Sequence, residues 1–229
     1  MSKRAWIIFV VICIAVLGGL VVLSRKDKAD VSSTDQNSVI AASTANGDIA
    51  DHVIGLKDSK VILIEYGDFQ CPYCGEAYPN IKKIAEDYKS KITFVFRNYP
   101  LATMHANAKS AAAAAEAAGL QGKYWEMHDK LYETQKDWES LSPEQRTDAY
   151  VNYAKAVGVT DIEKFKTDMG GNNVNKKINF DLALGNKVQV SGTPTFILKG
   201  EKVSEAASSS TISGNATEMR KAIDEALAK

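Results

Sequence analysis

The sequence predicts an α/β domain with a helical insertion between a βαβ half and a ββα half, preceded by an N-terminal transmembrane helix. Three observations lead to this fold class. A run of apolar residues without a charge opens the chain at residues 5–23. A strand, a helix and a second strand follow between residues 61 and 97, and an extended pattern returns only at residues 195–198. The stretch between them has helical periodicity, so helices interrupt a small sheet.

The apolar run at residues 5–23 is long enough, at about 1.5 Å per residue, to nearly cross a hydrocarbon core of about 30 Å. It exceeds the roughly 7 to 15 apolar residues of a signal peptide, and no convincing small-residue cleavage site precedes Ser24. We therefore expect residues 1–23 to be an uncleaved anchor rather than a removed signal. Basic residues flank the run on both sides, so charge alone does not decide its orientation.

Residues 24–50 are rich in Ser, Thr, Asp, Asn, Lys and Ala. Few large apolar side chains are available there to offset the entropy of ordering, which predicts a flexible polar tether. The globular part then begins at residue 51. The chain has 28 basic and 28 acidic residues, and leaving out Lys3 and Arg4 of the anchor makes the rest slightly acidic. Because the two signs are interspersed, nucleic acid is not an expected partner.

Residues 61–66 predict the first strand, and their continuous apolar character indicates a central position in the sheet. An amphipathic helix follows and ends near Ser90, with apolar residues at helical spacing from Ala77 to Tyr88. Cys71 stands where the strand gives way to this helix. Pro72 suits the first helical position, because proline there has its φ angle pre-set and gives up only an N–H without an intrahelical partner.

Residues 92–97 predict a second strand, parallel to the first because a long helix intervenes. Helical patterns then cover residues 105–118, 124–135, 143–157, 161–170 and 175–185. After the strand at 195–198, a short turn at 199–202 leads into Val203 and suggests a hairpin. An amphipathic helix at 216–228 closes the chain, which completes the ββα half.

The pair Cys71 and Cys74 can be joined and separated reversibly, which makes it a redox centre. A helix N-terminus carries about half a positive charge and can lower a cysteine pKa from ~8.5 to about 3.5–7.5. We therefore expect Cys71 to be the nucleophile and Cys74, one turn inward, the resolving thiol. A zinc site is the alternative, but it needs four ligands. The third cysteine, Cys13, lies in the apolar run, and the three histidines are scattered: His52, His105 and His128.

Several separated segments give this chain a resemblance to a known family. They are Cys71–Cys74 with the residues before it at 65–70, the segment 96–101 after the second strand, and Gly192-Thr193-Pro194. Together they resemble the DsbA-like class of thioredoxin-fold thiol-disulfide oxidoreductases, in particular its membrane-anchored, extracytoplasmic bacterial branch. The resemblance implies a thioredoxin-like domain formed by residues 51–104 and 186–229 around a helical insertion at 105–185.

The same resemblance implies roles for residues around the pair. Pro194 is expected to be cis, and Thr193 to lie beside the cysteines and offer backbone hydrogen bonds to an extended substrate. Glu65 precedes Cys71 by six positions, where this fold places a buried acid, so it is expected to relay the proton of Cys74. An exposed edge residue is the alternative interpretation of Glu65. Tyr73 leaves the oxidising strength open, because family members with histidine there are stronger oxidants.

His105 and His128 are not expected to be catalytic. His105 is expected near a helix start, and His128 is expected to pack or face solvent.

The sequence thus predicts an enzyme that exchanges disulfides with thiol-containing secreted proteins, most simply as a disulfide-forming oxidase. Its only redox group is the Cys71–Cys74 disulfide, with no metal or other cofactor expected. A quinone-linked thiol oxidase of the membrane is the reoxidising partner that the resemblance implies. The expected location is the cell membrane, crossed once, with the catalytic domain outside the cytoplasm. A reductase or isomerase using the same pair, and a non-redox peptide-binding or chaperone-like module, are the alternatives.

Overall fold

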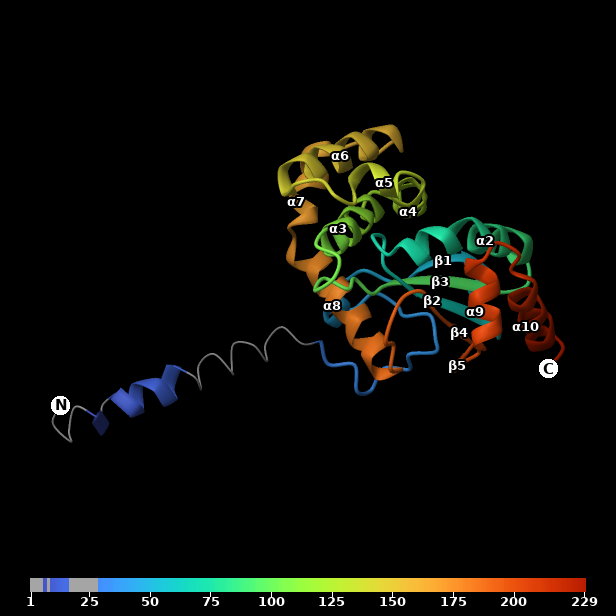
Figure 1. The fold of residues 1–229 in the computed structure, drawn as a ribbon, viewed down its shortest axis with the longest axis horizontal. Helices are drawn as coiled ribbons and strands as arrows, with labels where there is room; N and C mark the ends of the chain where they lie inside the picture. Colours follow the sequence, from blue (N-terminus) through green and yellow to red (C-terminus); the bar gives the residue numbers. More distant parts are fainter. Residues whose placement is uncertain (1–5, 8, 17–28) are drawn as a thin grey trace.

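The computed structural model describes residues 6–7, 9–16 and 29–229 (Figure 1). Among these residues, no helix is both long and apolar enough to span a membrane. Much of the predicted anchor, at residues 1–5, 8 and 17–23, lies outside the described residues, as does the start of the tether at 24–28. The anchor therefore stays a prediction.

The structure contains a five-stranded sheet in the order β1-β3-β2-β4-β5. Its strands are β1 (His52–Gly55), β2 (Ile62–Gly67), β3 (Thr93–Asn98), β4 (Thr195–Leu198) and β5 (Glu201–Lys202). β2 pairs with β3 in parallel and with β4 antiparallel, so the predicted first strand is indeed central. In this register Glu65 lies between Phe96 of β3 and Phe196 of β4.

The alternation of side chains along β2 separates two apolar layers. Leu63 belongs to the layer that includes residues of α2 (Pro72–Tyr88), α9 (Glu205–Ile212) and α10 (Thr217–Leu227). Ile64 and Tyr66 belong to the opposite layer, which is formed with α8 (Asn172–Lys187). Because side chains alternate in a strand, Glu65 points to the same side as Leu63, toward α2.

Helices of the predicted insertion gather at one end of the sheet (Figure 1). They are α3 (Ala108–Gly119), α4 (Tyr124–Glu133), α5 (Gln135–Trp138), α6 (Pro143–Ala156) and α7 (Ile162–Met169), and α8 leads back to the sheet. The alanines of α3 are buried, since their small side chains let neighbouring helices approach closely. Ser142 caps α6 by accepting a hydrogen bond from the Gln145 N–H, and Pro143 takes the first helical position.

Residues 29–50 correct one expectation. The described part of the predicted tether packs against the domain and is not free, with Val31 and Ile49 buried and a short 3₁₀ helix, η1 (Thr44–Asn46). Polar contacts hold it: Arg97 donates to the carbonyls of Gln36 and Ser38, at 2.5 and 2.7 Å. Hydrogen bonds from a distant, buried arginine to backbone carbonyls leave no mark in the composition of the segment that they hold.

Candidate active site

Cys71 and Cys74 lie at the N-terminus of α2, just beyond the C-terminal end of β2. Cys71 is the N-cap residue, with extended backbone angles (φ −69°, ψ 123°), and Pro72 occupies the first turn. Cys71 is 4% exposed and Cys74 is 0% exposed. Both are free thiols, and the Cys71 Sγ donates to the Thr193 carbonyl at 3.3 Å. The Cys71 sulfur therefore lies at the N-terminus of α2 and contacts the loop that contains the cis-proline.

The pKa values of the two thiols are shifted in opposite directions. Hydrogen bonding from the Cys74 thiol lowers the pKa of Cys71 to about 6, against the effect of burial. The Thr193 side chain and the backbone N–H groups of Cys74 and Tyr73 lower the pKa further. Burial raises the pKa of Cys74 well above its ordinary value, and the negative charge of Cys71 raises it further. At neutral pH the pair therefore carries its negative charge on Cys71, which makes Cys71 the nucleophilic sulfur.

A cleft of about 540 Å³ lies beside the pair and is lined by Tyr73, Thr193, Pro194, Lys202 and Val203 among others. The Thr193–Pro194 peptide bond is cis, as the family resemblance implied. Tyr73 projects from the dipeptide between the cysteines and is 59% exposed. The cleft offers exposed aromatic surface beside the cis-proline loop and next to the reactive sulfur, which suits an extended peptide.

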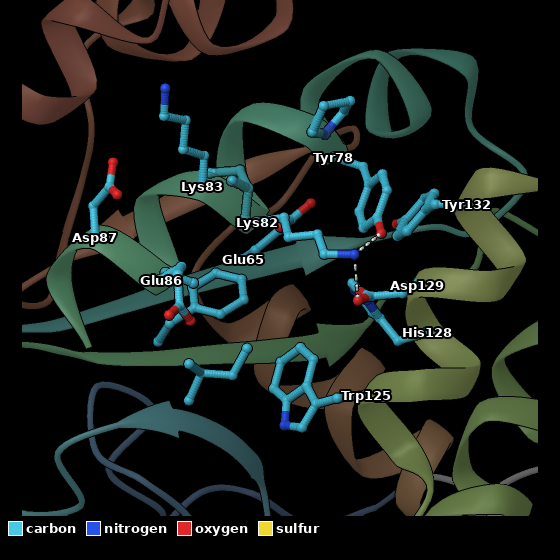
Figure 2. A pocket seen from close by; sticks show the side chains of 15 residues that line it. Glu65, Tyr78, Lys82, Lys83, Glu86, Asp87, Trp125, His128, Asp129 and Tyr132 are labelled. Atoms are coloured by element: carbon cyan, nitrogen blue, oxygen red, sulfur yellow. Dashed lines mark hydrogen bonds and ion pairs between the residues drawn. The ribbon is translucent and has the colours of Figure 1, made fainter. Parts of the chain in front are cut away.

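Glu65 is buried, with 3% of its surface exposed, which excludes the alternative of an exposed edge residue. Burial, followed by the negative charge of Cys71, raises the pKa of Glu65 to about 8. The side chain borders a cavity of about 530 Å³ between α2 and α4. Lys82 and Tyr78 of α2 and Asp129 of α4 line the same cavity (Figure 2). Lys82 contacts Asp129 at 2.8 Å and Tyr78 at 2.9 Å.

Gln135 is a contributor that the sequence did not reveal. This buried side chain of α5 donates to the carbonyls of Phe69 and Cys71, at 2.8 and 2.9 Å. Gln70 adds a second connection, because its amide donates to the Glu139 carbonyl at 2.7 Å and accepts from the Asn107 N–H at 2.6 Å. The helical insertion thus holds the loop that carries Cys71. A glutamine far away in sequence, within an ordinary helical pattern, gives no signal of this role.

His105 and His128 have interaction partners other than the cysteine sulfurs. His128 is buried in α4 among aromatic rings, where burial lowers its pKa, so the packing interpretation holds. His105 precedes α3, as expected, and its ring contacts the carboxylate of Asp68.

Comparison with curated proteins finds a partial match to proteins named Na(+)/H(+) antiporter. Over 152 residues the chain is 38% identical to the Na(+)/H(+) antiporter NhaA 1 of Salinispora arenicola. The match covers 66% of this chain but only 22% of the antiporter, so the chain spans about a fifth of the length of that relative.

Solved structures give matches along most of the chain. BdbD from Bacillus subtilis has a TM-score of 0.66 at 22% identity, covering 84% of this chain and 100% of that one. The thiol-disulfide exchange protein alpha-DsbA2 from Wolbachia pipientis has a TM-score of 0.62 at 23% identity, covering 76% and 86%. The model of the family described as Thioredoxin matches residues 48–224. The chain therefore belongs to the thioredoxin family, with the fold of its DsbA-like thiol-disulfide oxidoreductases.

Proposed function

We propose that this protein is a thiol-disulfide oxidoreductase that forms disulfides in secreted proteins through Cys71 and Cys74. One observation carries the proposal: a sulfur with a pKa of about 6 lies at a helix N-terminus, against the cis Thr193–Pro194 bond and beside an open cleft. A non-redox peptide-binding module would not require two thiols whose pKa values are shifted in opposite directions.

The reaction starts from the Cys71–Cys74 disulfide. A substrate thiolate attacks the Cys71 sulfur, forming a mixed disulfide and releasing Cys74, which takes up a proton because its pKa is raised. A second substrate thiolate then attacks the substrate sulfur of the mixed disulfide, and Cys71 leaves as a thiolate. The substrate loses two electrons to form its disulfide, and the cysteine pair gains them. Cys71 is a good leaving group, since its pKa of about 6 lets it remain ionised at neutral pH.

Glu65 supports the release of Cys74 in this scheme. With a pKa of about 8, its carboxyl group holds a proton at neutral pH and can supply it to the departing Cys74 sulfur. Glu65 lines the cavity between α2 and α4 (Figure 2), and we infer that solvent entering this cavity returns the proton to the carboxyl group. Glu65 is thus proposed as the proton relay of the pair.

The direction of exchange follows from which form of the pair is favoured. A depressed Cys71 pKa stabilises the dithiol form and makes the disulfide a stronger oxidant, which supports the oxidase over the reductase. Tyr73 makes no hydrogen bond to either sulfur through its exposed ring, so its contribution comes through its backbone N–H.

The proposed setting is the outer face of the cell membrane, with residues 1–23 as a single-pass anchor. The apolar run of the sequence supports this. Reoxidation is assigned to a membrane quinone-linked thiol oxidase, and thiol-containing secreted proteins are the substrates. No nucleic acid is part of the proposal.

Equilibration of the purified protein with reduced and oxidised glutathione tests the direction. We expect a potential nearer that of the oxidising members of the fold, about −120 mV, than that of thioredoxin, about −270 mV. A value at the thioredoxin end would replace the oxidase by a reductase with the same residues. Retained activity in cells of the double variant Cys71→Ser/Cys74→Ser would instead favour the non-redox module.

A further inference from the structure

The carboxylate of Asp68 is a buried junction in the loop between β2 and α2. Asp68 is 1% exposed, and its carboxylate accepts three hydrogen bonds. One oxygen accepts from the Gln70 N–H at 2.8 Å. The other accepts from the Leu101 N–H at 2.9 Å and lies 2.7 Å from Nδ1 of His105. This one side chain therefore joins the loop before Cys71 to the segment that follows β3.

The main chain of the same residue reaches both cysteines. The Asp68 carbonyl accepts from the Cys71 N–H at 3.1 Å. The Asp68 N–H is directed at the Cys74 sulfur, where it partly counters the burial that raises the pKa of that thiol. Holding the Asp68 side chain in place thus also holds a main-chain donor and a main-chain acceptor at the redox pair.

His105 is the side-chain donor in this arrangement. Its ring is about one-sixth exposed, with a side-chain exposure of 17%, while the carboxylate that it contacts is fully buried. The backbone on either side of the ring is fixed, because the His105 N–H donates to the Leu101 carbonyl at 2.9 Å and the His105 carbonyl accepts from the Ala108 N–H at 3.1 Å. The imidazole therefore connects the fixed backbone before α3 to the loop between β2 and α2.

We propose that Asp68 and His105 form a positioning pair, in which the His105 imidazole fixes the Asp68 carboxylate and thereby holds the Asp68 main chain against both cysteines. The inference rests on the proposed function, in which Cys71 is the reactive sulfur. In this proposal the pair acts through the cysteines, because the Asp68 carboxylate is fully buried. Loosening the pair lets the loop before Cys71 move relative to the N–H groups of α2, which weakens thiolate stabilisation at Cys71.

The test compares His105→Leu with His105→Asn in the full-length, reduced protein. Leucine has a similar size but no donor, whereas the asparagine side-chain N–H can occupy the place of the imidazole Nδ1. The ultraviolet absorbance of the thiolate is followed against pH, together with the rate of reaction with oxidised glutathione. We expect His105→Leu to shift the thiolate titration upward and slow the reaction at mildly acid pH about three- to tenfold. His105→Asn should restore most of both.

Asp68→Asn supplies a second route to the same answer, because it keeps one acceptor oxygen and replaces the other by a donor that faces His105 and the Leu101 N–H. It should also shift the titration of Cys71. The matched control is Asp161→Asn, which weakens a carboxylate cap on the Lys164 N–H (2.8 Å) in the insertion and should leave the titration unchanged.

Two outcomes would overturn the proposal. In the first, His105→Leu lowers the unfolding temperature but leaves thiolate titration and reaction rate as in the wild type, which reduces His105 to a structural residue. In the second, Leu and Asn shift the titration equally, so the hydrogen bond is not the cause. If His105→Leu does not fold, the comparison of His105→Asn and Asp68→Asn with the wild type decides by the same criteria. A wild-type pair without exchange activity would defeat the proposed function instead, while the thiolate titration could still be measured.

Discussion

At the scale of single residues, the site depends on a difference between two like atoms. Cys71 and Cys74 are one helical turn apart, yet the pKa of the first falls to about 6 and that of the second rises. The helix N-terminus and the Cys74 thiol stabilise charge on Cys71, whereas full burial opposes charge on Cys74. Because of this difference, the pair carries one negative charge at neutral pH, and the charge lies on Cys71.

Alkylation of the reduced protein measures that difference directly. Iodoacetamide should modify Cys71 with a rate that rises to half its maximum near pH 6, because only the thiolate reacts. Peptide mass spectrometry locates the label. Preferential modification of Cys74, or a midpoint near the ordinary thiol value of about 8.5, would contradict the assignment.

Glu65→Gln should change both stability and rate. The pKa of Glu65 is raised to about 8 from an ordinary 4.5, so the folded protein disfavours the ionised form. Below pH 4.5 the carboxyl is neutral in both states and no penalty arises. As pH rises from 4.5 to 8 the wild type loses stability relative to the glutamine variant, by on the order of a few kcal/mol.

Denaturant titrations of the reduced proteins at several pH values check the sign of this change. Disulfide exchange should be slower in Glu65→Gln, because glutamine cannot supply a proton to Cys74. A stability difference that does not vary with pH would show that Glu65 is not held neutral. An unaltered exchange rate would remove Glu65 from the proton path.

Residues with a chemical signature in the sequence were the predictable ones. The spacing of Cys71 and Cys74, and the resemblance that includes Thr193 and Pro194, pointed to residues that lie together in the structure, with the Thr193 carbonyl at the Cys71 sulfur. Gln135 and Asp68 could not be predicted in this way. Their roles depend on hydrogen bonds to backbone atoms. Nothing in the sequence distinguishes a glutamine or an aspartate that makes such bonds from one that does not.

At the scale of elements, the N-terminus of α2 is fixed from two sides. On one side, the loop before α2 continues directly from β2. On the other side, Gln135 of α5 donates hydrogen bonds to the carbonyls of Phe69 and Cys71 in this loop. The helix charge at this end acts on Cys71 only while the sulfur stays close to the free N–H groups. The insertion is therefore part of the redox site, even though none of its atoms reacts.

Gln135→Ala should lower the stability by about 1–3 kcal/mol, because two buried carbonyls lose a donor. It should also reduce the exchange rate with a thiol peptide, since the backbone of Cys71 becomes less fixed. Gln145→Ala is the matched control: that exposed glutamine of α6 hydrogen-bonds the Ser142 N–H at 3.2 Å, and its loss should cost under about 1 kcal/mol with an unchanged rate. Equal effects of the two variants on the rate would argue against support by α5.

Strongly patterned elements were predicted well. The β2–α2–β3 unit, the insertion helices, β4 and α10 match their periodicity. Short elements were missed or misplaced: the helices η1 and α5 were not predicted, and β5 takes up half of the turn predicted at 199–202. β1, four residues long at the edge of the sheet, and α9, a helix rich in serine, were missed as well. β1 gains its strand conformation by pairing with β3, and α9 packs Ala207 into the apolar layer beside α2, so neither depends on a local pattern.

At the scale of the whole molecule, buried charges join the segment before β1 and the helix α8 to the sheet. Asp51, Arg97, Lys177 and Asp181 are fully buried in a chain of ion pairs, with Arg97–Asp51 at 2.7 Å and Lys177–Asp181 at 2.7 Å. The neighbouring cations hold the pKa of Asp51 well below its usual range. Arg97 also binds the carbonyls that order residues 36–38, so the same network closes the N-terminal segment over the sheet.

Lys187→Met tests how that segment is held. The Lys187 ammonium donates to the carbonyls of Val31, Ser32 and Thr34, at 3.1, 3.1 and 2.8 Å. Removing it should speed amide hydrogen exchange in residues 31–38 severalfold while the exchange of β2 and α2 stays the same. Lys176→Met on the same helix is the control. Unchanged exchange in residues 31–38 would show that Lys187 does not hold the segment.

The central claim is that Cys71 alone meets the substrate sulfur, and trapping the mixed disulfide tests it most directly. In Cys74→Ser the resolving thiol is gone, so incubation with a peptide disulfide should leave the peptide linked to the protein. Mass spectrometry of digested, non-reduced complexes should place the link at Cys71, and Cys71→Ser should give no complex. A link at Cys74 in the Cys71→Ser variant, formed as fast as the Cys71 link, would contradict the account.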